Sequence, residues 1–249
     1  MISARMATFP ARRMRLRKAL TQLTPQVDEI RLCLNEYDSI PEEISDIPKV
    51  YPAIPDVDLK DVGKFMFDAN DKDEVFLVDD DIDYPEDYVY RTRQAARNAA
   101  ALDNAVFGYH GTVYRRIHVK RRVINAALGR GLGPYPPGSL KDLYSFHKEL
   151  THARIVSQLG TGTVYCLGAN LPDIRTMSGS EQRVDVRMAA WAARTGRRMI
   201  ALPRTANWIP TTEDNDSSIY HKFTQYLPQE LICEIESFGF SVPNAGKRI

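Results

Sequence analysis

Hydrophobic and polar positions follow two periods along this chain, and together they predict strands separated by helices. Residues 2–7 and 29–35 are predicted to form the first two strands. Between them Pro10 suits the first turn of a helix, whose apolar positions partly follow helical spacing: Met14, Leu16, Leu20 and Leu23. Further strands are predicted at 49–51, 75–78, 105–108, 164–166 and 199–202, and further helices at 88–101, 181–194 and 229–237. This alternation predicts an α/β fold with a mostly parallel sheet flanked by helices.

Two segments lack this periodicity and are predicted to be loops. Residues 39–58 are rich in proline and acidic residues and surround the short strand at 49–51. Residues 112–139 begin with several basic residues and continue into a run of glycines and prolines, which predicts a mobile loop. The 249 residues contain no internal repeat and no linker-like stretch, so we expect a single domain.

Three consecutive aspartates, Asp79, Asp80 and Asp81, follow directly on the apolar strand at 75–78. Ligands bind at the carboxyl ends of such strands in open α/β sheets, so the position favours a binding site over a simple acidic loop. Side chains alternate along a strand, and we therefore expect Asp79 and Asp81 to share a side while Asp80 points away. Like charges this close need a counter-cation, and Mn²⁺ or Mg²⁺ held by one or two carboxylates usually completes its shell with water and substrate phosphates.

Bulk composition narrows the class of protein. A net charge of +1, with 43% hydrophobic and 26% charged residues, is typical of a globular protein and gives no reason to expect a nucleic-acid partner. Cys33, Cys166 and Cys233 are widely separated and have no metal-ligand spacing, which indicates buried structural thiols in a reducing, cytoplasmic setting. No apolar run reaches the roughly 20 residues needed to cross a bilayer. The basic start of the chain could be a targeting peptide, but its pattern predicts the first strand and helix of the fold.

Residues 76–89, which contain the aspartates and a Tyr-Pro-x-Asp-Tyr tail, resemble the metal-binding Asp-x-Asp segment of family 2-type glycosyltransferases with the GT-A fold. Other stretches agree in order. Residues 8–12 resemble the nucleotide-contacting turn of that family, and residues 61–65 resemble its element facing the base and ribose. Weaker likenesses lie at 25–28, 34–38, 108–111, 160–163 and 184–187. The likeness therefore covers most of the chain, and the aspartate segment is its most specific part.

The resemblance implies transfer of a hexosyl group from a nucleotide-diphosphate sugar, expected to be a UDP-sugar, to a glycan or lipid-linked glycan during bacterial surface polysaccharide synthesis. It also implies a GT-A-like domain with a nucleotide-sugar-binding half, residues 1–111, and an acceptor-binding half, residues 112–249. The enzyme would act in the cytoplasm, with peripheral contact at the inner face of the membrane.

The resemblance also implies roles for individual residues. Asp81 would bind the metal, with His221 as a further ligand. The donor-binding set would be Thr8, Pro10, Arg12, Asp61, Lys64, Asp79 and Asp80. Within that set Asp79 would hold the ribose or a metal-bound water, and Asp80 would touch the sugar or serve the structure. Arg12 and Lys64 would neutralise phosphate or brace the uracil-binding turn, although each taken alone is more typical of a solvated surface cation.

Inverting transfer needs a base that takes the proton of the acceptor hydroxyl. Asp185 is the candidate by its match to the later acidic residue of the family. The alternative is a carboxylate that interacts with the positive N-terminal end of a helix.

Further candidates are open to two interpretations. His110 would face the cleft or be a hydrogen-bonded structural histidine, and Trp208 would stack on a sugar, whereas Trp191 is expected in the core. Residues 114–122 mix cations with aromatic side chains. Without a recognised nucleic-acid motif, this segment fits a phosphate-bearing acceptor or an anionic membrane surface better than nucleic acid.

Two other functions remain open from the sequence. A haloacid-dehalogenase-like phosphatase also places Asp-x-Asp after an apolar strand, but that motif has threonine or valine at the position of Asp83 in this chain. A catalytically inactive nucleotide-binding module could use the aspartates to hold a structural cation. Release of phosphate from simple monoesters would identify the first, and nucleotide binding without turnover would identify the second.

Overall fold

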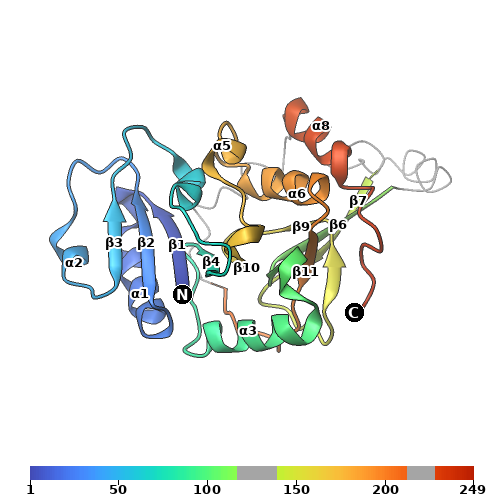
Figure 1. The fold of residues 1–249 in the computed structure, drawn as a ribbon, viewed down its shortest axis with the longest axis horizontal. Coiled ribbons are helices and arrows are strands. Elements are labelled where there is room, and N and C mark those ends of the chain that lie inside the picture. Colours follow the sequence, from blue (N-terminus) through green and yellow to red (C-terminus); the bar gives the residue numbers. More distant parts are fainter. Residues whose placement is uncertain (117–138, 212–227) are drawn as a thin grey trace.

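A computed structural model describes residues 1–116, 139–211 and 228–249 of the chain. One large mixed sheet of eight strands runs through it, in the order β3-β2-β1-β4-β10-β5-β11-β8 (Figure 1). The strands in this order are Val50–Ala53, Glu29–Leu34, Ile2–Thr8, Glu74–Val78, Thr163–Leu167, Ala105–Gly108, Arg198–Ala201 and Arg154–Val156. The first four strands of this order are mutually parallel, β5 and β11 are parallel, and β10 and β8 are antiparallel to their neighbours. The predicted α/β class with a mostly parallel sheet is confirmed.

Helices cover both faces of this sheet. The α-helices are α1 Arg13–Leu23, α2 Glu42–Ser45, α3 Tyr88–Ala99, α5 Ile174–Met177, α6 Val184–Arg194 and α8 Gln229–Phe238. Short 3₁₀ helices are η1 Pro10–Arg12, η2 Thr24–Gln26, η3 Lys60–Phe65, η4 Leu102–Asn104 and η5 Gly168–Asn170. Buried side chains of α1 and α3 belong to one apolar cluster, while those of α5, α6 and α8 belong to a second cluster on the other face (Figure 1).

Each helix buries the face that its apolar spacing defines. In α1 the buried positions are Leu16, Ala19, Leu20 and Leu23, a one-sided stripe at helical spacing. The central strand β4 is buried over Val75–Val78 because strands lie on both sides of it and helices on both faces. The segment at the start of the chain forms β1 and α1, as its pattern predicts, and β1 lies between β2 and β4.

The prediction of buried thiols is confirmed for two of the three cysteines. Cys33 and Cys166 are buried in strands of the large sheet, whereas Cys233 is exposed. Cys233 stands on α8 between the buried positions Leu231 and Ile235, on the side that does not face the core.

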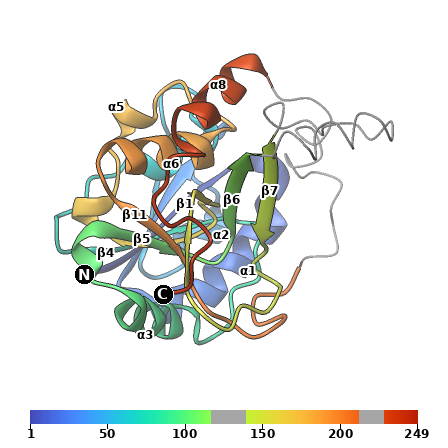
Figure 2. The ribbon, with the colours of Figure 1, turned by 90° about the vertical axis from the view of Figure 1, so that its right-hand side faces the viewer.

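A second, smaller sheet corrects the prediction of a loop at 112–139 at the two ends of that segment. Residues Gly111–Arg116 form β6 and Ser139–Tyr144 form β7, and the two pair in antiparallel register. Figure 2 shows β6 and β7 side by side, and the short strand β9, Gln158–Leu159, pairs with the other side of β6. The first four residues of β6 are buried. Its two arginines, Arg115 and Arg116, stand only at its exposed end. Residues 117–138 lie outside the described residues.

No helix in the described part of the chain combines the length and apolar character needed to cross a membrane.

Candidate active site

The carboxyl ends of two adjacent parallel strands, β1 and β4, bring the first part of the site together. Thr8 is the last residue of β1, and Asp80 and Asp81 follow β4. The Thr8 hydroxyl donates a hydrogen bond to Asp80 Oδ2 at 2.6 Å. Arg12, at the end of η1, donates from one nitrogen, Nη1, to Asp80 Oδ1 at 2.8 Å and to Asp81 Oδ2 at 2.6 Å. The turn after β1, which begins at Pro10, is therefore tied to the aspartate segment by a single guanidinium group.

Burial and charge act against each other in this group. The Asp80 side chain is 3% exposed and that of Asp81 28% exposed. Burial raises the pKa of Asp80, and the Arg12 charge opposes the rise. Burial also raises the pKa of Asp81, the charge of nearby Asp79 raises it further, and Arg12 again opposes. The Asp79 charge thus acts on Asp81, while the hydroxyl of Thr8 on β1 holds Asp80.

Lys64 supplies the second cation of the site from η3. Its side chain is 2% exposed and forms an ion pair with Asp79 Oδ1. Burial alone would lower the pKa of Lys64, but the charges of Asp79, Asp61 and Asp185 outweigh it and raise the pKa. This buried ammonium group therefore stands among three carboxylates. It is not the solvated surface cation that the sequence alternative describes.

A glycine allows η3 to come this close to the sheet. A Cβ added at Gly63 would lie 2.4 Å from Cys33 Sγ and 3.4 Å from the Cβ of Ala7. Cys33 is on β2 and Ala7 on β1, so η3 lies directly on these two strands. Any side chain at position 63 would move η3, and Lys64 with it, away from the acids.

The turn 160–163 before β10 and the start of α6 form the remaining wall. Thr161 donates two hydrogen bonds to Asp185 Oδ1, from its backbone nitrogen and from its hydroxyl, both at 2.8 Å. Burial raises the pKa of Asp185, and the bonds from Thr161 oppose the rise. A Cβ added at Gly162 would lie 2.1 Å from Asp79 Oδ2, so this glycine is in direct contact with the carboxylate.

Asp61 links η3 to the segment just before α6. Its Oδ1 accepts a hydrogen bond from the backbone nitrogen of Gln182 at 2.6 Å, and Gln182 has a left-handed backbone with φ of 64°. Burial raises the pKa of Asp61 to about 6. Five segments of the chain therefore converge on Asp79 and Asp81: the turns after β1 and β4, η3, the turn before β10 and the start of α6.

One side chain, Tyr84, has a positioning role that the sequence does not indicate. The backbone N–H of Asp79 donates to the Tyr84 hydroxyl oxygen at 2.7 Å, and this hydroxyl donates to the carbonyl oxygen of Gly162 at 2.7 Å. The buried phenol thus joins the aspartate turn to the turn 160–163. Its place in the Tyr-Pro-x-Asp-Tyr tail makes it visible in the sequence, but nothing there indicates that its partners are backbone groups.

The carboxylates fit the usual ligand set of a Mg²⁺ or Mn²⁺ ion that shares a phosphate with its substrate. Within the described ranges no group of three or more His, Cys, Asp or Glu side chains is arranged to hold a metal. Asp81, which is partly exposed, could offer a hard oxygen ligand with Asp79 beside it, and one or two carboxylates suffice when water and phosphate complete the shell. The predicted ligand His221 lies outside the described residues.

The remaining candidates from the sequence have contacts other than with the clustered acids. His110 contacts the Phe146 ring, and burial lowers its pKa to about 4, as expected for a structural histidine. Trp208 stacks on Tyr88 and donates from Nε1 to Asp87 at 2.9 Å. Trp191 packs partly buried against the core, with the Arg197 guanidinium over its ring.

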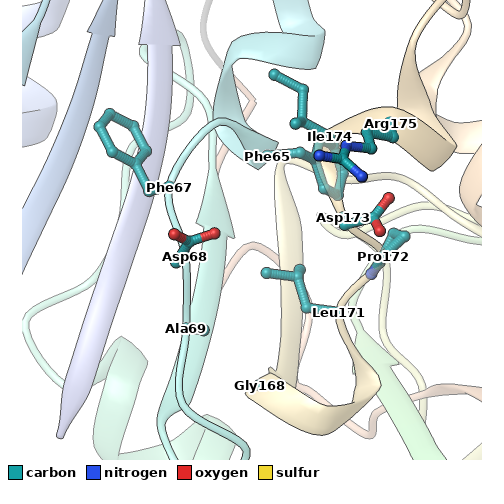
Figure 3. Close-up of a pocket in the computed structure, with 10 residues that line it drawn as sticks. All are labelled: Phe65, Phe67, Asp68, Ala69, Gly168, Leu171, Pro172, Asp173, Ile174 and Arg175. Atoms are coloured by element: carbon teal, nitrogen blue, oxygen red, sulfur yellow. The ribbon is translucent and has the colours of Figure 1, made fainter.

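A cavity of about 390 Å³ lies elsewhere, beside the loop after η3 and the segment leading to α5 (Figure 3). Its walls include Phe65, Leu171 and Ile174, and none of the candidate site residues lines it. Leu167, the residue before Gly168 in its wall, pairs with Glu74 at the start of β4, whereas the aspartates follow the end of that strand. The acid cluster and this cavity are therefore separate features.

Comparison with protein-family models and with curated protein sequences finds no match to this chain.

Proposed function

We propose that this protein is a metal-dependent glycosyltransferase of GT-A type that moves a sugar from a nucleotide-diphosphate donor, a UDP-sugar, to a glycan acceptor. The observation that carries the proposal is the convergence of Asp79, Asp81 and Asp185 with Arg12 and Lys64 at the carboxyl edge of parallel strands. This edge is where α/β sheets bind nucleotides. The resemblance of residues 76–89 to the Asp-x-Asp segment supports the same function.

The chain's own residues suit a donor that carries a diphosphate. Asp81 would bind Mn²⁺ or Mg²⁺, with Asp79 holding a metal-bound water or the ribose, and the metal would neutralise charge on the departing diphosphate. Arg12 already spans Asp80 and Asp81 and can turn its remaining N–H groups toward phosphate oxygens. Thr8 fixes Asp80, so the floor of this donor site is held in place before the donor binds.

Asp185 suits the role of base for the acceptor hydroxyl. Thr161 holds its Oδ1, and among the described residues Oδ2 has no hydrogen-bond partner. Burial raises its pKa, which makes the carboxylate a better proton acceptor than a solvated one. With Asp185 as base the transfer would invert the configuration at the sugar carbon.

The acceptor and the cellular setting are part of the same proposal. The acceptor would be a glycan or lipid-linked glycan in bacterial surface polysaccharide synthesis. The reaction would take place in the cytoplasm, at or near the inner face of the membrane.

A donor screen tests the proposal. A panel of nucleotides and nucleotide sugars is offered with Mn²⁺, and binding is scored by saturation-transfer NMR and thermal shift. We expect a nucleoside diphosphate and its sugar conjugate to bind only with the metal, and the conjugate to transfer its sugar once an acceptor is added.

The same screen separates the two rival functions. Hydrolysis of p-nitrophenyl phosphate without nucleotide would favour the phosphatase, in which Asp79 would be the nucleophile. In the structure Asp83, the position that departs from the phosphatase motif, pairs with Lys18 of α1 at 2.6 Å. Nucleotide binding without turnover on any acceptor would favour the inactive binding module.

A further inference from the structure

A second cavity, of about 420 Å³, lies between α3 and the segments that follow β7 and β11. Its lining residues include Arg91, Asn98, Thr151, His152, Arg204 and Trp208, with Ile249 at the end of the chain also in its wall. Most of these side chains carry hydrogen-bond donors, and no acidic side chain lines the cavity. The Thr151 hydroxyl and His152 Nδ1 are 2.8 Å apart and share a hydrogen bond. Two arginines and several donor groups are thus present in the wall.

Arg204 is the unusual group in this wall. Its residue surface is 7% exposed, and its guanidinium donates to three backbone carbonyls, of Lys148 at 2.9 Å, Leu202 at 3.0 Å and Ser145 at 2.5 Å. Among the described residues it has no carboxylate in an ion pair. Buried arginine is normally paired with an acid, and here burial lowers its pKa to about 10. The carbonyls fix its orientation but leave its charge without an anion.

Neighbouring groups extend the positive potential. The pKa of His110 is lowered first by burial and then by the charges of Lys141, Arg204 and His147. At the outer end of the cavity Arg91 lies over the Trp208 ring at 5.4 Å and pairs with Asp87 at 2.7 Å. Because Arg91 is about half exposed, its pairing with Asp87 is weak and leaves donors available to a ligand.

We propose that this cavity binds the phosphate group of a small molecule, with Arg204 as the buried charge and Arg91, Asn98, Thr151 and His152 as donors around it. Phosphate oxygens accept several charge-assisted hydrogen bonds at once and would supply the anion that Arg204 lacks. The site is distinct from the aspartate cluster, where acidic side chains would repel an anion that carries no metal. The inference does not depend on the proposed sugar transfer.

Tryptophan fluorescence offers a direct test, because the chain has two tryptophans and one of them lines the cavity. A Trp191→Phe background leaves Trp208 as the sole reporter. Inorganic phosphate is titrated at constant ionic strength set with sodium chloride, which holds electrostatic screening fixed. We expect a saturable change in Trp208 emission. A glucose 1-phosphate arm shows whether the cavity accepts a phosphate ester or only free phosphate, and both outcomes support an anion site.

Two variants on α3 provide a matched comparison. Arg91→Gln removes a donor at the cavity and should weaken phosphate binding about tenfold. Arg97→Gln makes the same change in charge on the same helix, but Arg97 faces Glu74 and does not line the cavity, so it should bind as the parent does. Arg204→Lys should also weaken binding, with its melting temperature recorded because Arg204 joins two loops.

Asp81→Asn should leave the phosphate titration unchanged, which separates this site from the donor site. The proposal is overturned if Trp208 shows no saturable response to millimolar phosphate, if Arg97→Gln weakens binding as much as Arg91→Gln, or if Asp81→Asn abolishes the response.

Discussion

The positive charge of Lys64 compensates the carboxylates around it in the candidate site. A fully buried ammonium group is costly, and here the cost is offset by Asp79 in direct contact and by Asp61 and Asp185 nearby. The same charge keeps three carboxylates compatible with one another. Lys64 therefore contributes to the stability of the fold in addition to any role in binding.

Replacing Lys64 tests this balance. Lys64→Met leaves Asp79 without its partner and should lower the free energy of unfolding by about 2 kcal/mol, less than for a fully buried pair, because Asp79 is 36% exposed and regains water. Adding Asp79→Asn should restore part of the loss. Urea unfolding of both single variants and the double variant measures the coupling, and strictly additive losses would contradict it.

Asp61 gives the site a pH dependence with a defined sign. Its folded pKa of about 6 is above the reference value of 3.8, so the fold holds the proton more tightly than the unfolded chain does. That contribution to stability is complete below about pH 4 and is lost as the pH rises through 6. Asp61→Asn keeps an oxygen for the Gln182 N–H and carries no charge to bury.

We therefore expect Asp61→Asn to be more stable than the parent at pH 8, by on the order of 1–2 kcal/mol, with the difference vanishing near pH 4. Thermal unfolding across this range measures it. A variant that is less stable at pH 8 would mean that the Asp61 charge stabilises the fold.

The turn before β10 brings Gly162 into contact with the Asp79 carboxylate. Gly162→Ala would put a methyl group where Asp79 Oδ2 stands, so the carboxylate must move. We expect metal-dependent nucleotide affinity to fall by about tenfold or more, since small displacements of binding groups are costly. Gly160→Ala in the same turn, where a Cβ would lie 3.2 Å from the His110 side chain, serves as the control. Equal affinity in both variants would remove Asp79 from the site.

The start of α6 carries the proposed base. Asp185→Asn can still accept the Thr161 hydrogen bonds through its amide oxygen, but it cannot take a proton. Turnover should fall by a factor of about 10² to 10⁴, while donor affinity and melting temperature remain near those of the parent. Retained turnover, or loss of the fold, would identify Asp185 as a structural carboxylate that holds the turn 160–163.

The elements show which parts of the fold a sequence pattern can predict. Continuous apolar runs such as 75–78 identify central strands, because a strand that is buried on both faces has apolar side chains at successive positions. The direction of β10 has no such signal, since an antiparallel strand in the middle of a sheet is as apolar as a parallel one. Strands β8 and β9 and helices α2 and α5 have two to four residues, too few to show a period, and were not predicted.

The candidate site was predictable in position but not in its internal pairing. The aspartates after β4 follow from strand and ligand geometry. The contacts of Arg12 with Asp80 and Asp81, and of Lys64 with Asp79, join residues that are 15 to 69 positions apart and depend on the sheet order. Sequence patterns describe each cation alone, and only the fold shows that the site holds its own counter-charges.

The large sheet of the whole molecule holds two separate features. The aspartates with Arg12 and Lys64 lie at the carboxyl ends of its parallel strands, and the cavity lined by hydrogen-bond donors lies beside α3. If the proposed function is correct, binding of a metal and a nucleotide must rearrange the existing ion pairs, because Asp81 is engaged by Arg12 and Asp79 by Lys64. The nucleotide phosphates would then take over as partners of the two cations. The affinity for the nucleotide should therefore be higher in the presence of the metal, and the affinity for the metal higher in the presence of the nucleotide.

The most direct measurement of this claim is the affinity of a nucleoside diphosphate, UDP first, by isothermal titration with Mn²⁺ and with EDTA, for the parent and for Asp81→Asn. We predict binding that requires Mn²⁺ in the parent and falls at least tenfold in Asp81→Asn, while the melting temperature without ligand is retained. Nucleotide affinity that is the same in EDTA as in Mn²⁺, or the same in both proteins, would contradict a metal-assisted donor site at Asp81.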